Sequence, residues 1–261
     1  MKLFSLMIST SLFILTCSAT AQTSEQKGLA IAKQMKARDI GWGNSQSDMY
    51  MTLRTRKGQE IVRQMRSKSL EVDGDGDKAL TIFDTPLDVK GTAFLSFSHS
   101  TGNDDQWIYL PAIKRVKRIS SRNRSGPFLG SEFSFEDLSS FEVEKFNFNY
   151  LGDDQLNGQA MVKISMDPVD PHSGYSRADA WVDTDQYRVQ KIDFYDRRST
   201  LLKTLTISDY KLYKGKYWRA DKQSMINHKT GKSTDMLIKN LKFDVGLSDS
   251  DFNQNRLKRA R

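Results

Sequence analysis

Residues 202–243 read LKTLTISDYKLYKGKYWRADKQSMINHKTGKSTDMLIKNLKF. Apolar and polar residues alternate along three stretches of this segment, and the residues between the stretches, such as Lys229 to Gly231, are typical of tight turns. The pattern predicts three antiparallel strands connected by hairpins. No helical pattern separates the strands, which argues against a parallel sheet whose strands alternate with helices.

The same alternation extends over most of the chain and predicts about a dozen strands. Two segments have a different pattern. Residues 24–39 have the apolar spacing of an amphipathic helix with Ser24 as its N-cap, and residues 249–257 are expected to form a short helix before the basic end of the chain. The expected strands comprise residues 49–53, 61–70, 79–83, 92–97, 106–110, 115–119, 143–150, 160–166, 178–182, 187–195, 202–212, 217–226 and 234–243.

This order of elements predicts a mainly β fold (α+β) with a single large curved antiparallel sheet. An apolar sheet face cannot stay open to water, so the sheet must close on itself or be covered. The helix at residues 24–39 and a long ordered loop at residues 120–140, with a helical turn near residues 135–138, are the only spare elements. We therefore predict an incomplete β-barrel covered by the N-terminal helix and a central lid. Nothing marks a linker or a repeat, so residues 22–261 are expected to form one domain.

The start of the sequence predicts export. Lys2 precedes an apolar stretch, residues 3–15, and Ala19-Thr20-Ala21 fits the small-residue site at which signal peptides are cleaved. The stretch is too short to cross a bilayer as a helix, which takes about 20 residues. Cleavage of residues 1–21 would remove Cys17, whose use as a lipid anchor is disfavoured by the threonine before it. We expect a soluble protein in a bacterial periplasm.

Composition narrows the class of protein. The 261 residues include 40 Lys and Arg against 32 Asp and Glu, a net charge of +8, and 38% are hydrophobic. These values exclude a membrane-embedded bundle and an acidic disordered chain. One cysteine cannot build a disulfide framework or a cysteine-based zinc site, and the three histidines lie too far apart in sequence for a local metal motif. We expect no metal and no cofactor.

Two short motifs resemble ligand loops but lack necessary residues. Asp73-x-Asp75-x-Asp77 has the spacing that begins a calcium loop, yet its sixth position is Lys78 rather than glycine and its twelfth is Asp84 rather than glutamate. Gly231-Lys232-Ser233 lacks the glycine that a phosphate-binding loop has five residues earlier. Both motifs are expected to be hairpin turns.

The densest basic cluster lies on and around the expected strand at residues 115–119. Because the protein is expected to be exported, nucleic acid is not an expected partner. Anionic lipid head groups or an acidic protein fit this charge, and so does a solvated strand edge that discourages association between sheets. The cluster comprises Lys114, Arg115, Lys117, Arg118, Arg122 and Arg124.

Apolar residues on several strands predict the lining of a cavity. Methionine side chains can repack around varied apolar ligands. A dozen strands in one sheet also curl around more interior than a single helix fills, although an ordinary filled core is the default for any one residue. A register slip of one residue would reverse every assignment. The expected lining comprises Met49, Met51, Leu53, Phe83, Leu95, Trp107 and Tyr109 on the sheet and Phe128, Leu129, Phe133 and Phe135 on the lid.

Four blocks of sequence resemble one known family. Residues 90–95 read KGTAFL, residues 107–111 read WIYLP and residues 115–119 read RVKRI. Residues 126–138, GPFLGSEFSFEDL, form the most specific block. With the order of elements, these blocks resemble the LolA-like outer-membrane lipoprotein-sorting protein family, in particular a subgroup associated with transporters of the RND/MMPL type. The resemblance covers essentially the mature chain.

The resemblance implies an incomplete β-barrel covered by helices, with an apolar cavity that takes acyl chains. Family members act as periplasmic carriers of lipoproteins or lipids, and an arginine that bonds to the lid holds it closed; Arg115 and Arg118 are the candidates here. The resemblance also implies delivery toward the outer membrane, with an inner-membrane RND/MMPL-type transporter as a candidate partner. We expect the carrier to be a monomer.

The leading hypothesis is a non-catalytic periplasmic carrier that shelters the acyl chains of a lipoprotein or lipid. The alternative is a non-catalytic periplasmic sensor or adaptor that uses the same fold to bind a protein partner. A hydrolase with His99 or His172 as its base is a third hypothesis, although the sequence contains no G-x-S-x-G motif.

Overall fold

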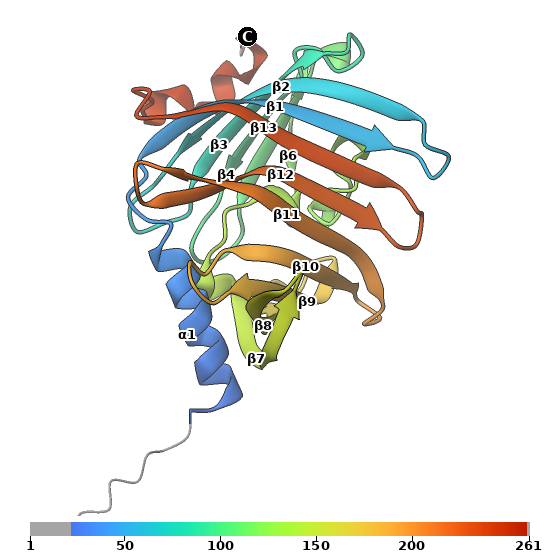
Figure 1. Ribbon diagram of the computed structural model, residues 1–261. Coiled ribbons are helices and arrows are strands. Elements are labelled where there is room, and N and C mark those ends of the chain that lie inside the picture. The colour runs from blue at the N-terminus through green and yellow to red at the C-terminus, as the bar shows by residue number, and fades with distance from the viewer. Residues whose placement is uncertain (1–21, 260–261) are drawn as a thin grey trace, which may run out of the picture.

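The computed structural model describes residues 22–259, and its thirteen strands form one antiparallel sheet (Figure 1). The expected signal peptide, residues 1–21, lies outside the described residues. The predicted fold class is confirmed, because the sheet is curved and not closed. Its strands are β1 Asn44–Arg54, β2 Glu60–Leu70, β3 Lys78–Thr85, β4 Ala93–Phe97, β5 Asp105–Leu110, β6 Arg115–Ile119, β7 Phe146–Leu156, β8 Gln159–Pro168, β9 Tyr175–Asp183, β10 Val189–Asp196, β11 Leu201–Tyr213, β12 Tyr217–Asn227 and β13 Ser233–Phe243.

The strand order explains why the molecule has a lid. Neighbours run from β6 back to β1, then β1 pairs with β13, and the order continues from β13 back to β7. The strands β6 and β7 follow each other in the chain but form the two opposite edges of the open sheet. The segment between them, residues 120–145, has to pass from one edge to the other; its apolar residues pack on the concave face, and it lies inside the arch of the sheet in Figure 1.

The crossing segment consists of turns and single-turn 3₁₀ helices. The helical turn expected near residues 135–138 is confirmed by η4. Residues 143–145 were expected to begin a strand, and this is wrong: they form η5, and β7 begins at Phe146. Apolar residues alternate at positions 141 and 143, which is a strand pattern, but here they pack on the core from a turn and a 3₁₀ helix. The 3₁₀ helices of the chain include η1 Pro111–Ile113, η2 Ser121–Asn123, η3 Phe128–Gly130, η4 Glu136–Leu138 and η5 Val143–Lys145.

The predicted N-terminal helix is α1, Ser24–Ala37, and it packs against the edge strand β7. Its N-cap is Thr23, not Ser24, because the Thr23 hydroxyl accepts a hydrogen bond from the backbone N–H of Gln26 at 3.2 Å. The Ser24 hydroxyl instead donates to the backbone carbonyl of Tyr150 on β7 at 2.8 Å. Gly28 allows the close approach of helix and strand, since a Cβ there would lie 2.8 Å from the carbonyl carbon of Asn149.

Two apolar cores lie on opposite faces of the sheet. The larger one fills the concave face and includes residues of the lid and of α1. The smaller one lies on the outer face of β3, β4 and β5, where the C-terminal segment covers it with Phe252 and Leu257. This segment contains η6, Asp249–Asp251, and η7, Gln254–Arg259, and lies above the sheet in Figure 1. The expectation that only α1 and the lid cover the sheet is therefore wrong for the outer face.

Candidate functional site: the concave face and its lid

The structure brings together eight of the eleven residues that were expected to line a cavity. On the sheet, Met51 pairs with Met236 of β13 and with Arg63 of β2, and Met65 pairs with Phe83 of β3. All these side chains belong to the concave face, where the lid packs. The eight residues are Met49, Met51, Leu53 and Phe83 on the sheet and Phe128, Leu129, Phe133 and Phe135 on the lid.

The other three residues, Leu95, Trp107 and Tyr109, lie on the outer face, and their predicted placement with Met51 and Phe83 is wrong. Leu95 pairs with Trp107, and all three pack in the core beneath the C-terminal segment. The concave face receives Phe94 and Ile108 from the same strands. The reason is that β4, AFLSF, is apolar on both faces, so its alternation does not indicate which side faces the lid.

Aromatic rings of the lid fill the hollow of the sheet. Phe128 and Phe133 are each 2% exposed. The ring centroid of Phe128 lies 5.1 Å from that of Phe94, 5.8 Å from that of Phe83 and 5.5 Å from that of Phe135. These separations are typical of favourable aromatic packing. The expected open cavity is therefore not what these residues form: in this closed structure the protein's own side chains fill the apolar concave face.

A buried arginine holds the lid. Arg63 of β2 is 8% exposed and donates from Nη1 to the backbone carbonyl of Leu129 at 2.7 Å. Leu129 has a left-handed backbone with φ of 49°, a conformation that costs leucine about 1–2 kcal/mol and that surrounding contacts must stabilise. Burial lowers the pKa of Arg63 from its usual value, and Asp88 partly offsets this.

Arg63 corrects the earlier candidates for the lid arginine. Arg118 pairs with Asp105 on the neighbouring strand β5, and Arg115 lies exposed on the edge strand β6. The sequence contained a signal for Arg63, because it is two residues from Met65 and therefore shares the apolar face of the strand expected at residues 61–70. A charged residue at an inward position needs a polar partner, and the lid carbonyl provides it.

A second polar latch lies at the far end of the lid. Lys203 of β11 forms an ion pair with Asp137 of the lid at 2.5 Å, and each side chain is only 5% exposed. Burial raises the pKa of Tyr175 well above its usual value, so its hydroxyl stays protonated and donates to Asp137 at 2.8 Å. The backbone N–H of Ser134 also donates to Asp137, at 2.6 Å. Lys203 is held in an ion pair and the Tyr175 hydroxyl stays protonated, so neither side chain is prepared to act as a nucleophile. The arrangement favours a structural role, in which these residues hold the lid.

Neutral hydrogen bonds complete the attachment of the lid. Gln106 of β5 donates from Nε2 to the carbonyl of Phe135 at 2.9 Å, and the backbone N–H of Glu132 donates to the Thr234 hydroxyl at 3.0 Å. The lid is thus attached to β2, β5, β11 and β13 by side chains rather than by strand pairing. These contacts are separate from the strand pairs that build the sheet.

The predicted ligand loops are turns. Residues 73–77 connect β2 and β3, and residues 229–231 lie in the turn between β12 and β13, as expected. Asp75 pairs with His99 at 2.8 Å and accepts a hydrogen bond from the backbone N–H of Ser100. Over residues 22–259, no group of His, Cys, Asp and Glu side chains is arranged to hold a metal ion. In the same range, no helix is long and apolar enough to span a membrane.

The end of the lid lies beside a carboxyl group with a high pKa. Asp77 donates from its backbone N–H to the Ser140 hydroxyl at 3.2 Å. The pKa of the Asp77 side chain is raised to about 7, chiefly by burial; Lys36 lowers the pKa, and nearby Glu142, Asp39 and Glu71 add to the rise. The folded protein therefore binds a proton at Asp77 that the unfolded chain releases near pH 4.

This difference predicts how the stability of the protein depends on pH. Between about pH 4 and pH 7 only the folded state holds the Asp77 proton, so its contribution to the free energy of unfolding falls as pH rises and levels off above pH 7. Asp77→Asn should abolish this contribution. Urea unfolding at pH 5 and pH 8 measures it: the wild-type stability should fall more than that of the variant. Equal falls would show that Asp77 has an ordinary pKa.

Comparison with known proteins places the open sheet and its lid in a known class. A LolA superfamily protein from Nitrosomonas europaea is 17% identical and has the same fold, with a TM-score of 0.69 over 90% of this chain and 99% of that one. A DUF1329 family protein from Desulfovibrio piger is 29% identical, with a TM-score of 0.85 over 90% of this chain and 99% of that one. The fold is therefore LolA-like.

A more similar structure defines the family. A domain from Vibrio parahaemolyticus, provisionally described as an outer membrane lipoprotein-sorting protein domain, is 57% identical, with a TM-score of 0.88 over 90% of this chain and 100% of that one. A family model whose description reads "Uncharacterized protein" matches residues 75–259. No curated protein matches the chain. The chain belongs to the family of this Vibrio domain, and its resemblance to LolA-like proteins is confirmed at the level of the fold.

Proposed function

We propose that the protein is a non-catalytic periplasmic carrier that binds the acyl chains of a lipoprotein or lipid against the concave face of the sheet. One observation carries this proposal: the lid, which is not part of the sheet, inserts phenyl rings into a large apolar face. An acyl chain would take the place of these rings and contact the residues that they now cover. The proposed contacts are Met49, Met51, Leu53 and Phe83 on the sheet.

The free energy gained by burying an acyl chain is similar to the free energy lost by exposing the lid, as a carrier requires. Burying an acyl chain of about 16 carbons gains roughly 12 kcal/mol at about 0.8 kcal/mol per CH₂. Exposing four large apolar side chains of the lid costs about 1.5–3 kcal/mol each, or roughly 6–12 kcal/mol in total. The two values are of similar size, so binding can be favourable and still reversible. A carrier that must release its cargo needs this near balance.

We further propose that the carrier moves its cargo from the inner membrane toward the outer membrane, and two observations support this direction. The described function of the Vibrio domain favours a role in sorting lipoproteins toward the outer membrane. The sequence blocks favour cooperation with an inner-membrane RND/MMPL-type transporter. We propose that the chain is exported by a cleaved signal peptide at residues 1–21 and acts as a monomeric domain, residues 22–261.

A photoreactive fatty acid tests the proposed binding face. Purified protein is incubated with a diazirine analogue of palmitate, irradiated and digested, and the labelled peptides are identified by mass spectrometry. We expect labels on peptides that contain Met51 and Phe83, whereas the C-terminal peptide with Phe252 and Leu257, which packs on the outer face, serves as an internal control. Native mass spectrometry of protein isolated from the periplasm should show copurified lipid. A defined protein partner with no lipid and no labelling would favour the adaptor hypothesis instead.

A further inference from the structure

A cavity of about 900 Å³ opens on the outer face of the sheet, away from the lid. Its floor is formed by the strands β1 to β4 and β13, and its wall is formed by the C-terminal segment. Leu80, Ile82, Leu95 and Leu257 contribute apolar surface at the bottom. Its volume lies within the range of about 300–1,000 Å³ that is typical of small-molecule sites.

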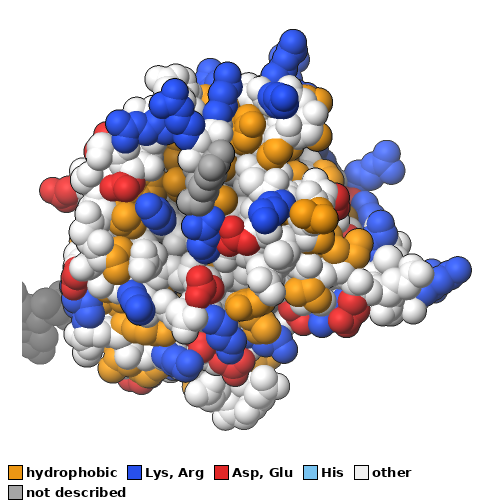
Figure 2. Space-filling view, turned by 90° about the horizontal axis from the view of Figure 1, so that it is seen from above, with side chains coloured by type: hydrophobic (Ala, Val, Ile, Leu, Met, Phe, Trp, Pro, Cys, Tyr) orange, Lys and Arg blue, Asp and Glu red, His pale blue; other side chains and the backbone are white. Residues whose placement is uncertain are grey.

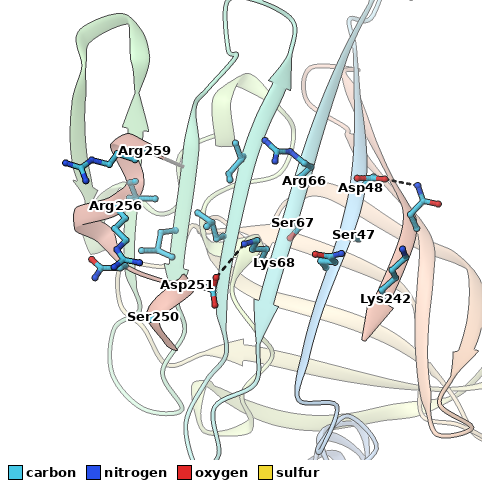
Figure 3. Close-up of a pocket in the computed structure, with 17 residues that line it drawn as sticks. Ser47, Asp48, Arg66, Ser67, Lys68, Lys242, Ser250, Asp251, Arg256 and Arg259 are labelled. Atoms are coloured by element: carbon cyan, nitrogen blue, oxygen red, sulfur yellow. Dashed lines mark hydrogen bonds and ion pairs between the residues drawn. The ribbon is translucent and has the colours of Figure 1, made fainter. Parts of the chain in front are cut away.

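Positive charge dominates this cavity. Figure 3 shows the basic side chains reaching it from separate elements: from β2, from β13 and from η7. Figure 2 views this side of the molecule and shows Lys and Arg side chains spread over it, with Asp and Glu side chains among them. The lining contains two acidic residues, Asp48 and Asp251, and five basic ones, Arg66, Lys68, Lys242, Arg256 and Arg259.

Most of these cations are available to a ligand. Arg66 is neutralised by Asp84 at 2.8 Å, and Lys68 lies 3.7 Å from Asp251. Within residues 22–259, no carboxylate forms an ion pair with Lys242, Arg256 or Arg259.

The two acids of the cavity already have hydrogen-bond donors. Asp251 accepts a hydrogen bond from the backbone N–H of Ser248 at 3.0 Å, and Asp48 accepts one from the Asn240 amide at 2.7 Å. With five basic residues against two acidic ones, and with only Arg66 neutralised from outside by Asp84 in the described part of the chain, the cavity keeps an excess of positive charge.

We propose that this cavity binds a phosphate-bearing ligand. Guanidinium groups form paired hydrogen bonds with phosphate oxygens, and an ammonium group adds a point charge. Ser250 adds a neutral donor at the wall formed by the C-terminal segment. A concave cavity that is partly apolar at its base favours a compact ligand over the flat surface of an acidic protein. The site lies on the opposite face of the sheet from the lid, so it is independent of acyl-chain binding there.

The ligand has two possible sources, a free phosphomonoester or the head group of an anionic phospholipid. Isothermal titration with glycerol 3-phosphate tests the first source, and sedimentation with phosphatidylglycerol vesicles, compared with phosphatidylcholine vesicles, tests the second. Binding in either arm supports the site and identifies its source. Failure of both probes to bind would overturn the proposal.

Matched variants separate the cavity from overall charge. The cavity variant is Lys242→Gln/Arg256→Gln/Arg259→Gln, and the control, Lys114→Gln/Arg115→Gln/Lys117→Gln, removes three charges at and beside the edge strand β6. We expect the cavity variant to bind at least about tenfold more weakly, because it loses several phosphate contacts, and the control to bind nearly as wild type. Equal losses in both variants would overturn the proposal.

A measurement on the wild-type protein tests the site without depending on the folding of a variant. Amide NMR shifts are recorded during titration with glycerol 3-phosphate or with short-chain phosphatidylglycerol. Shifts should concentrate at β2, at Lys242 and at residues 254–259. Shifts confined to the lid would contradict the site. Because labelling of Met51 and Phe83 by the photoreactive fatty acid reports only on the concave face, failure of one proposal is distinguishable from failure of the other.

Discussion

Replacing Asp137 with alanine should lower the free energy of unfolding by about 3–5 kcal/mol. The change leaves the Lys203 ammonium, only 5% exposed, without its carboxylate partner. It also removes the acceptor for the Tyr175 hydroxyl and for the Ser134 backbone N–H. If the lid detaches before the sheet unfolds, Lys203 regains water, and the loss is limited to the free energy that closes the lid. Urea unfolding measures the loss, and proteolysis of the lid reports its detachment.

Two further variants show whether the buried pair is the cause. The double variant Asp137→Leu/Lys203→Met replaces both charges with apolar groups and should recover much of the loss. Glu60→Ala removes a half-exposed partner of Arg54 and should cost no more than about 1 kcal/mol. A loss for Asp137→Ala no larger than that for Glu60→Ala would show that the latch does not hold the lid.

The second large effect is expected for Phe128→Ala. Removing a buried phenylalanine side chain costs about 3–5 kcal/mol, because apolar contacts are lost and a cavity remains. Here the cavity would lie among Phe83, Phe94 and Phe135 on the proposed acyl-chain face. The variant should therefore be less stable and also bind a fluorescent fatty acid more tightly, since it carries one competing ring fewer.

Phe252→Ala is the matched control for this prediction. Phe252 is 3% exposed and packs in the outer core beneath the C-terminal segment. Its removal should lower stability by a similar amount without changing the affinity for the fatty acid. If both variants bind the fatty acid equally, the gain for Phe128→Ala reflects general loosening and not competition between lid and ligand.

The fold could be predicted from the sequence because a period of two residues is repeated thirteen times with clear turns between the repeats. The same period shows which side chains of a strand face the concave core only where the residues on the other side of the strand are polar. In β1, Met49, Met51 and Leu53 alternate with polar residues, and their common face was predicted correctly. In β4 both sides are apolar, so Leu95 was assigned to the concave face although it lies on the other.

The residues that hold the lid could not be predicted from the sequence, because they depend on contacts between segments that lie far apart in the chain. Arg63 and the Leu129 carbonyl are 66 residues apart in the chain, and so are Lys203 and Asp137. No local pattern connects such partners, and a lid carbonyl accepts a hydrogen bond whatever side chain its residue bears. The C-terminal cover was also missed, because only Phe252 and Leu257 in a polar segment bury their side chains.

The central claim is that an acyl chain replaces the lid on the concave face. Hydrogen exchange measured by mass spectrometry, with and without saturating palmitate, tests it most directly. In the closed state the lid amides are protected, for example that of Phe128, which donates to the carbonyl of Phe133 at 2.7 Å. Palmitate should increase exchange over residues 126–138 and leave exchange in β1 to β3 unchanged or slower. Unchanged protection of the lid at saturating palmitate would contradict it.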